Sequence, residues 1–221
     1  MKKLISSFLL LILLTACSNS EIPETFETSE TTAVSIETTK ATITTTTHIE
    51  TTTESTEPTY DNWLFVGDSR FVSWSTWGFE GEYIAEVGQG LNMIYDNYDE
   101  IISYRDYNIV FALGANQWWS GEEYVDLLNS FPDEFTENNK IIVMSVNPTD
   151  GSYDYLNENY DDFNSIVRDW IRKDYQYVDS STYMKENGFT TSDGLHYTQT
   201  QDEIIYDFLM NEVAQNGLRM L

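Results

Sequence analysis

The run Asn62-Trp63-Leu64-Phe65-Val66 is apolar along almost its whole length and ends at Gly67-Asp68-Ser69. An apolar run of this length, bounded by a glycine and polar residues, is typical of a strand that is covered on both faces. Four further runs of this kind follow along the chain, at residues 83–87, 109–113, 141–146 and 175–178. The sequence therefore predicts five buried strands.

Segments with the apolar spacing of helices lie between and after these runs. In the segments 91–102, 163–171 and 204–209, apolar residues recur every three or four positions. Strands that alternate with helices form a parallel sheet with helices on both faces. The expected fold of residues 61–221 is therefore a three-layer α/β/α sandwich with a central parallel sheet of about five strands.

Glycine and polar residues follow the ends of the predicted strands. They form four blocks: Gly67-Asp68-Ser69-Arg70, Gly88-Gln89-Gly90, Gly114-Ala115-Asn116-Gln117 and Asp193-Gly194-Leu195-His196. The carboxyl ends of parallel strands meet at one edge of the sheet, and ligands bind outside that edge. We therefore expect the four blocks to form one site.

The residue types in these blocks suit acyl transfer. A serine hydroxyl such as that of Ser69 is a weak nucleophile until a base removes its proton. His196 is the only histidine in residues 61–221, and Asp193 is close enough in sequence to orient its ring. The N–H groups of Ser69 and Gly88 and the side-chain amide of Asn116 could donate to an oxyanion.

The order of these blocks resembles that of the SGNH, or GDSL, hydrolase superfamily, and the resemblance covers nearly all of residues 61–221. It implies a flavodoxin-like fold in which Ser69 is the nucleophile, His196 the base and Asp193 the residue that orients His196. It also implies an oxyanion hole formed by the Ser69 N–H with Gly88 and Asn116.

Some positions near these blocks are less clear-cut. Asp68 matches the middle of the Gly-Asp-Ser block, where the resemblance implies a structural role. Gly90 is the second choice for the Gly88 position, because Gly88 follows the strand directly. Gln117 departs from the pattern, since many members have an aspartate there, and this leaves the local hydrogen bonding open.

The resemblance implies a serine esterase that removes small acyl groups, first of all acetyl, from an extracellular carbohydrate through an acyl-enzyme. The same site would serve an O-acyltransferase if a sugar hydroxyl replaced water. A non-catalytic glycan-binding lipoprotein is a third possibility, against which the intact Ser69, Asp193 and His196 argue. A glycosidase with two carboxylates carries little weight, because a domain with 29 acidic residues always offers a pair.

The candidate substrate contacts are Arg70, Trp118 and Asn147, which follow the predicted strands closely. Arg70 could bind a substrate carboxylate or form a surface ion pair. Trp118 belongs to a group of tryptophans near the site blocks that could stack on sugar rings or pack against the sheet. The others in this group are Trp74, Trp77 and Trp119.

The net charge of −26 argues against nucleic acid as the main ligand, because phosphate binding needs clustered Lys and Arg. The same acidity disfavours electrostatic docking on anionic lipid and strongly anionic polymers as substrate. With two histidines and one cysteine in the chain, we expect no metal site and no cofactor.

Residues 1–16 are predicted to be an export signal, with Lys2 and Lys3 before an apolar run too short to span a bilayer permanently. The sequence Leu14-Thr15-Ala16-Cys17 resembles a bacterial lipoprotein signal, in which Cys17 becomes lipidated. Residues 17–60, rich in Thr, Ser and Glu, would then form a disordered tether. The protein is therefore expected at the extracellular face of the bacterial membrane, where a lipid anchor would hold it. The domain is expected to be a monomer.

Overall fold

The computed structural model describes residues 60–219, with side chains to residue 215. The predicted signal, Cys17 and nearly all of the predicted tether lie outside the described residues. The strands are β1 (Asn62–Gly67), β2 (Glu82–Ala85), β3 (Tyr107–Ala112), β4 (Lys140–Met144) and β5 (Gln176–Val178). The α-helices are α1 (Ser69–Trp77), α2 (Asn92–Asp96), α3 (Tyr98–Ile101), α4 (Gly121–Asn129), α5 (Asp133–Glu137), α6 (Asn157–Trp170), α7 (Ser180–Asn187) and α8 (Gln199–Arg219). Two 3₁₀ helices are η1 (Trp118–Ser120) and η2 (Gly151–Leu156).

The strands pair in parallel in the order β2-β1-β3-β4-β5, which is the flavodoxin-like order. The prediction of a five-stranded parallel α/β/α sandwich is confirmed. Strand order reverses between β1 and β3, and such a switch point opens a crevice at the carboxyl ends of the strands. The segments after β1 and β3 carry Ser69 and Asn116, so both lie beside this crevice.

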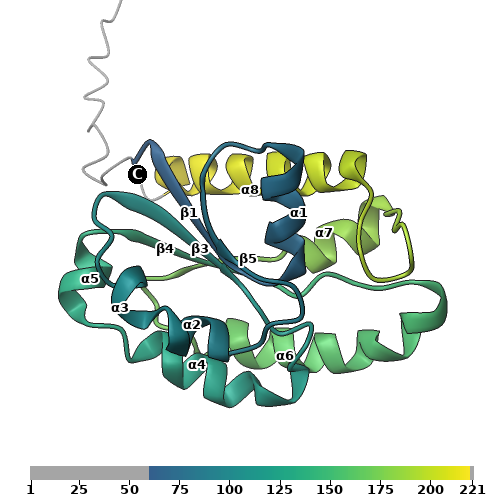
Figure 1. Cartoon of the computed structure of the whole chain (residues 1–221), viewed down its shortest axis with the longest axis horizontal. Helices are drawn as coiled ribbons and strands as arrows, with labels where there is room; N and C mark the ends of the chain where they lie inside the picture. The colour runs from purple at the N-terminus through teal and green to yellow at the C-terminus, as the bar shows by residue number, and fades with distance from the viewer. Residues whose placement is uncertain (1–59, 220–221) are drawn as a thin grey trace, which may run out of the picture. The chain divides into compact units, whose positions relative to one another are not determined.

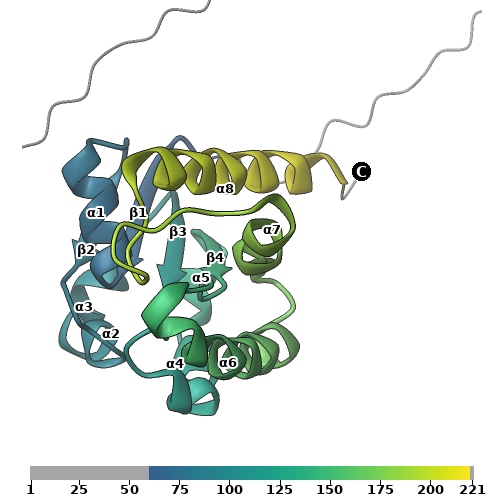
Figure 2. The same cartoon turned by 90° about the vertical axis from the view of Figure 1, so that its right-hand side faces the viewer.

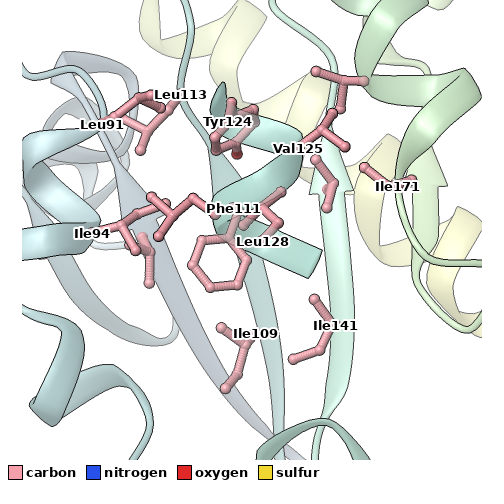
Figure 3. Packing of buried hydrophobic residues seen from close by; sticks show 14 of the residues in the cluster. Leu91, Ile94, Ile109, Phe111, Leu113, Tyr124, Val125, Leu128, Ile141 and Ile171 are labelled. Atoms are coloured by element: carbon pink, nitrogen blue, oxygen red, sulfur yellow. The ribbon is translucent and has the colours of Figure 1, made fainter. Parts of the chain in front are cut away.

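Successive residues of the strands point to opposite faces of the sheet and contribute to two separate hydrophobic clusters. Leu64, Ile109 and Ile141 pack with residues of α2 to α6 on one face. Phe65, Val110 and Ile142 pack with residues of α1, α7 and α8 on the other. Figures 1 and 2 show the resulting layers, with α1, α7 and α8 above the sheet and the other helices below it. Figure 3 shows part of the first cluster, in which α4 side chains meet the strands.

The predicted strand 83–87 and helix 91–102 differ from those in the structure. The strand ends at Ala85, and Val87 is 66% exposed in the turn that follows. The predicted helix is divided at Asn97 into α2 and α3. The Asn97 side-chain amide donates to the carbonyl of Met93 at 2.8 Å. In a continuous helix, the main-chain N–H of Asn97 would use this carbonyl as its acceptor, so the side chain competes with the helix.

Among residues 60–219, no helix combines the length and apolarity needed to cross a lipid bilayer.

Candidate active site

The turn between β1 and α1 presents Ser69 as the first residue of a helix. Asp68 caps that helix by accepting the main-chain N–H of Arg70 at 3.1 Å. Gly67 is required by close packing, because a Cβ there would lie 2.7 Å from the carbonyl oxygen of Ala112. The strand, the glycine and the cap together fix the position of the Ser69 hydroxyl.

The side chains of Ser69, His196 and Asp193 form one hydrogen-bonded chain. His196 Nε2 lies 3.2 Å from Ser69 Oγ, and His196 Nδ1 lies 2.8 Å from Asp193 Oδ2. A carboxylate can only accept, so Nδ1 carries the proton and Nε2 can accept the Ser69 hydroxyl proton. The distances are those expected between a base and the nucleophile that it activates.

Asp193 is itself held by the turn that it starts. Its Oδ1 accepts the main-chain N–H groups of Leu195 at 2.9 Å and His196 at 2.7 Å. Hydrogen bonds from His196 lower the pKa of Asp193 to about 2, the one from its main-chain N–H having the largest effect and the one from its ring the next largest. Asp193 is therefore a carboxylate at neutral pH, as the orientation of His196 requires.

The two loops expected to supply oxyanion donors are tied together by side-chain amides. Asn116 Nδ2 donates to the Gln89 carbonyl at 3.0 Å, and Gly88 has a φ of +76°, a conformation that favours glycine. Gln117 Oε1 accepts the main-chain N–H of Leu91 at 3.1 Å. Its amide also donates to Ser120 Oγ at 2.9 Å. Gln117 thus supplies the hydrogen bonding that its departure from the family pattern had left open.

Gly90 is needed for a different reason than Gly88. A Cβ on Gly90 would lie 2.3 Å from Gln117 Oε1, whereas a Cβ on Gly88 would meet nothing within 4 Å. Gly88 therefore shapes the turn through its backbone conformation, and Gly90 leaves space for the Gln117 amide.

Arg70 forms a buried ion pair, and the alternative of a surface ion pair is wrong. Its Nε and Nη2 donate to the two carboxylate oxygens of Asp68 at 3.0 and 3.2 Å, and Nη2 also donates to the Ala112 carbonyl at 3.1 Å. The Asp68 side chain is 1% exposed and the Arg70 side chain 12%. The pair braces the turn that carries Ser69, while contact of Arg70 with a substrate stays a prediction.

Five of the residues selected from the sequence line one pocket: Ser69, Arg70, Asn116, Asn147 and His196. The remaining wall is formed by Ala115, Val146, Thr149, Tyr160, Leu195 and Tyr197. Thr149, Tyr160 and Tyr197 were not among the residues selected from the sequence. Tyr160 lies three residues before Phe163, so extending the helical spacing of the predicted segment 163–171 backwards would have found it.

The four tryptophans near the site blocks have different surroundings. Trp74 is 2% exposed and packs against Phe71 and Phe65 in the core. Trp77 donates its indole N–H to Asp202 at 3.0 Å. Trp118 is half-buried, Trp119 is 65% exposed, and their rings meet edge to face at 5.5 Å. Neither Trp118 nor Trp119 lines the pocket around Ser69.

No protein-family model matches the sequence, and no curated protein matches it. Solved structures do match. An acetyl xylan esterase is 14% identical, with a TM-score of 0.53 over 69% of this chain and 99% of that one. The catalytic domain of Streptococcus pneumoniae peptidoglycan O-acetyltransferase A is 15% identical, with a TM-score of 0.53 over 71% and 96%. A GDSL-like lipase from Bacteroides thetaiotaomicron is 16% identical, with a TM-score of 0.52 over 72% and 89%.

The chain has the SGNH hydrolase fold. The fold implied by the sequence resemblance is confirmed. At these identities the SGNH hydrolase likeness concerns the arrangement of the chain, so the chemistry has to be argued from the side chains of the site.

Proposed function

We propose that the protein is a serine esterase that removes small acyl groups from a carbohydrate. The observation that carries this proposal is the chain of contacts from Asp193 through His196 to Ser69 at the switch point of the sheet. It holds a nucleophile, a base and the group that orients the base within hydrogen-bonding distance.

In the first step, Ser69 Oγ bonds to the ester carbonyl carbon while His196 Nε2 takes the hydroxyl proton. The carbonyl oxygen becomes an oxyanion, for which the N–H groups of Ser69 and Gly88 and the amide of Asn116 are the proposed donors. The bond to the leaving oxygen breaks, and His196 returns the proton to the released alcohol. Water then attacks the acyl-enzyme by the same route, which releases the acid and restores Ser69.

The choice of a small acyl group and a carbohydrate is supported by the kinds of protein that share the fold. They include acetyl xylan and acetyl esterases and a peptidoglycan O-acetyltransferase domain. Arg70, the cation that lines the pocket, is bound to Asp68, which favours a neutral ester over an anionic one. Asn147, in the pocket wall, and Trp118, which does not line the pocket, remain the other proposed substrate contacts.

An O-acyltransferase is the second candidate, because one of the matched structures is an O-acetyltransferase domain. It would form the same acyl-enzyme on Ser69 and pass the acyl group to a sugar hydroxyl in place of water. Incubating the acylated protein with and without free oligosaccharide separates the two activities. A transferase yields acylated sugar, whereas an esterase yields free acid in both cases.

The test of the nucleophile uses the full chain with p-nitrophenyl acetate and a serine-directed sulfonyl fluoride. Ser69→Ala should abolish both turnover and labelling, and His196→Ala should abolish turnover. Ser73→Ala is the matched control, because Ser73 lies one turn further along α1 and its hydroxyl contacts only the Ser69 carbonyl among the described hydrogen bonds. Unchanged turnover in Ser69→Ala would refute the proposal.

We further propose that lipidation of Cys17 anchors the protein at the extracellular face of a bacterial membrane, with residues 18–60 as a spacer. Cys17 is the only cysteine of the chain and follows directly on the predicted export signal, residues 1–16. Cys17→Ser should release the protein into the medium. If the variant stays in the membrane fraction, the lipid anchor is wrong.

A further inference from the structure

The residues that carry the proposed base lie on a segment with little regular structure. This segment, residues 190–198, connects α7 to α8. Within it, Thr191 and Tyr197 form an isolated β-bridge, and the Ser192 N–H donates to the His196 carbonyl at 2.7 Å. These bonds, like those of Asp193 to its own turn, shape the segment internally. They do not fix its distance from Ser69, which lies on α1.

Asp150, in the connection between β4 and α6, contacts this segment at two points. Its main-chain N–H donates to the Gly194 carbonyl at 2.9 Å, and its Oδ1 accepts the Thr191 hydroxyl at 2.7 Å. The Thr191 hydroxyl in turn accepts the Gly194 N–H at 2.9 Å. Asp150 therefore holds the residue on each side of the Ser192-Asp193 pair.

The fit between the two segments is close. Gly194 has a φ of +95°, and a Cβ on it would lie 2.8 Å from the Asp150 carbonyl oxygen and 3.0 Å from Tyr153 Cδ2. A side chain at position 194 would thus separate the segments. The Tyr197 hydroxyl makes a further hydrogen bond to the Pro148 carbonyl.

Asp150 can serve as a fixed point because its own segment is anchored to α6. Asn157, the first residue of α6, accepts the Thr149 N–H at 2.8 Å and donates to the Thr149 carbonyl at 2.9 Å. The Thr149 hydroxyl donates to the Tyr153 carbonyl at 2.7 Å. The same segment contributes Asn147 and Thr149 to the pocket wall.

We propose that Asp150 is a positioning residue, which acts through Thr191 and Gly194 to hold His196 in line with Ser69. The inference rests on the proposed function for its effect on turnover. No described hydrogen bond joins Asp150 to the imidazole, whose Nδ1 contacts Asp193. Loss of the Asp150–Thr191 bond would let the turn move away from Ser69, and misplacement by about 1 Å can lower a rate about 100-fold.

The decisive variant is Thr191→Val in the full chain, because it keeps the shape of the side chain and removes the hydroxyl. Thr191→Ser, which keeps the hydroxyl, is the conservative rescue. Thr182→Val is the matched control, because the Thr182 hydroxyl makes the same kind of bond to Asp179, at 2.8 Å, at the start of α7 outside the pocket wall. Asp150→Ala is a second test of the same contact from its other side.

Two readouts are needed. For Thr191→Val and Asp150→Ala, kcat on p-nitrophenyl acetate should fall about 10- to 100-fold while KM changes less than about threefold. In ¹⁵N NMR spectra at alkaline pH, the His196 ring should keep the Nδ1–H tautomer, because Asp193 lies in the same turn, while the Nε2 signal should shift as Nε2 loses the Ser69 hydroxyl. The full chain has only two histidines, so the His196 signals are assigned by their loss in His196→Gln.

The expected result is that Thr191→Ser and Thr182→Val match the parent protein in both readouts while the other two variants do not. If Thr191→Val keeps both the kcat and the Nε2 signal of the parent protein, the positioning role of Asp150 is wrong. If the parent protein has no Ser69-dependent turnover, the proposed function fails. The Nε2 signal of Thr191→Val then still decides whether Asp150 positions His196.

Discussion

Asp68 and Arg70 form a two-pronged ion pair on either side of Ser69, with N–O distances of 3.0 and 3.2 Å. The pair is buried, and Arg70 also binds the carbonyl that ends β3. Burying two charges is costly, but removing one partner is costlier still, because the remaining charge is left uncompensated. The pair therefore couples the turn that bears Ser69 to the neighbouring strand.

Arg70→Met should lower the free energy of unfolding by about 3–5 kcal/mol, because it leaves the Asp68 side chain buried without a cationic partner. Urea denaturation followed by circular dichroism measures this. Arg168→Met is the control, since the Arg168–Asp169 pair has side chains that are 49% and 61% exposed. An exposed pair contributes about 0–1 kcal/mol. Equal effects of the two variants would show that the Asp68–Arg70 pair does not stabilise the turn.

Gly90→Ala should lower kcat on p-nitrophenyl acetate by about tenfold or more, because its methyl group would displace the Gln117 amide. Gln117 ties the Gly88–Gly90 turn to the loop that carries Asn116, so both proposed oxyanion loops would shift. Gln117→Glu keeps the acceptor for the Leu91 N–H and should lose less activity than Gln117→Leu. Full activity in Gln117→Leu would contradict this account.

The sheet could be predicted because its strands are buried on both faces and are therefore apolar nearly throughout, as Leu64 to Val66 and Ile109 to Ala112 are. The glycines at their ends identified the edge where Ser69 and Asn116 lie. Contacts that depend on tertiary distance could not be predicted. Nothing in the sequence shows that Asp150 faces Thr191, or that Arg70 turns back onto Asp68 instead of into solvent.

Asp202 gives the protein a pH-dependent stability that the sequence does not show. It is 2% exposed, and its burial raises the pKa of the carboxyl to about 6, against the hydrogen bond from Trp77. The native state thus binds the proton more tightly than the unfolded chain. Burying the ionised carboxylate lowers the free energy of unfolding. This loss of stability is absent below about pH 4, grows as the pH rises to about 6, and is complete above that.

Asp202→Asn keeps an acceptor for the Trp77 N–H and removes the charge. Relative to the parent protein, its free energy of unfolding should rise by about 3 kcal/mol between pH 4 and pH 8. Urea denaturation of both proteins across this range measures the difference between their free energies of unfolding. The contributions of the other carboxyl groups cancel in this difference. A flat difference for Asp202→Asn would show that burial does not raise the pKa of Asp202.

The tryptophans provide a test of carbohydrate binding, because they separate packing from surface contact. Trp74→Ala should lower the free energy of unfolding by about 3–5 kcal/mol, since it opens a cavity in the core. Trp119→Ala should change it by less than about 0.5 kcal/mol, because the ring is 65% exposed.

If Trp118 and Trp119 stack on a sugar, Trp119→Ala should raise KM for an acetylated xylo-oligosaccharide about two- to tenfold. Turnover of p-nitrophenyl acetate, which has no sugar ring, should stay the same. An equal loss on both substrates would show that the tryptophan pair supports the site and does not bind the glycan.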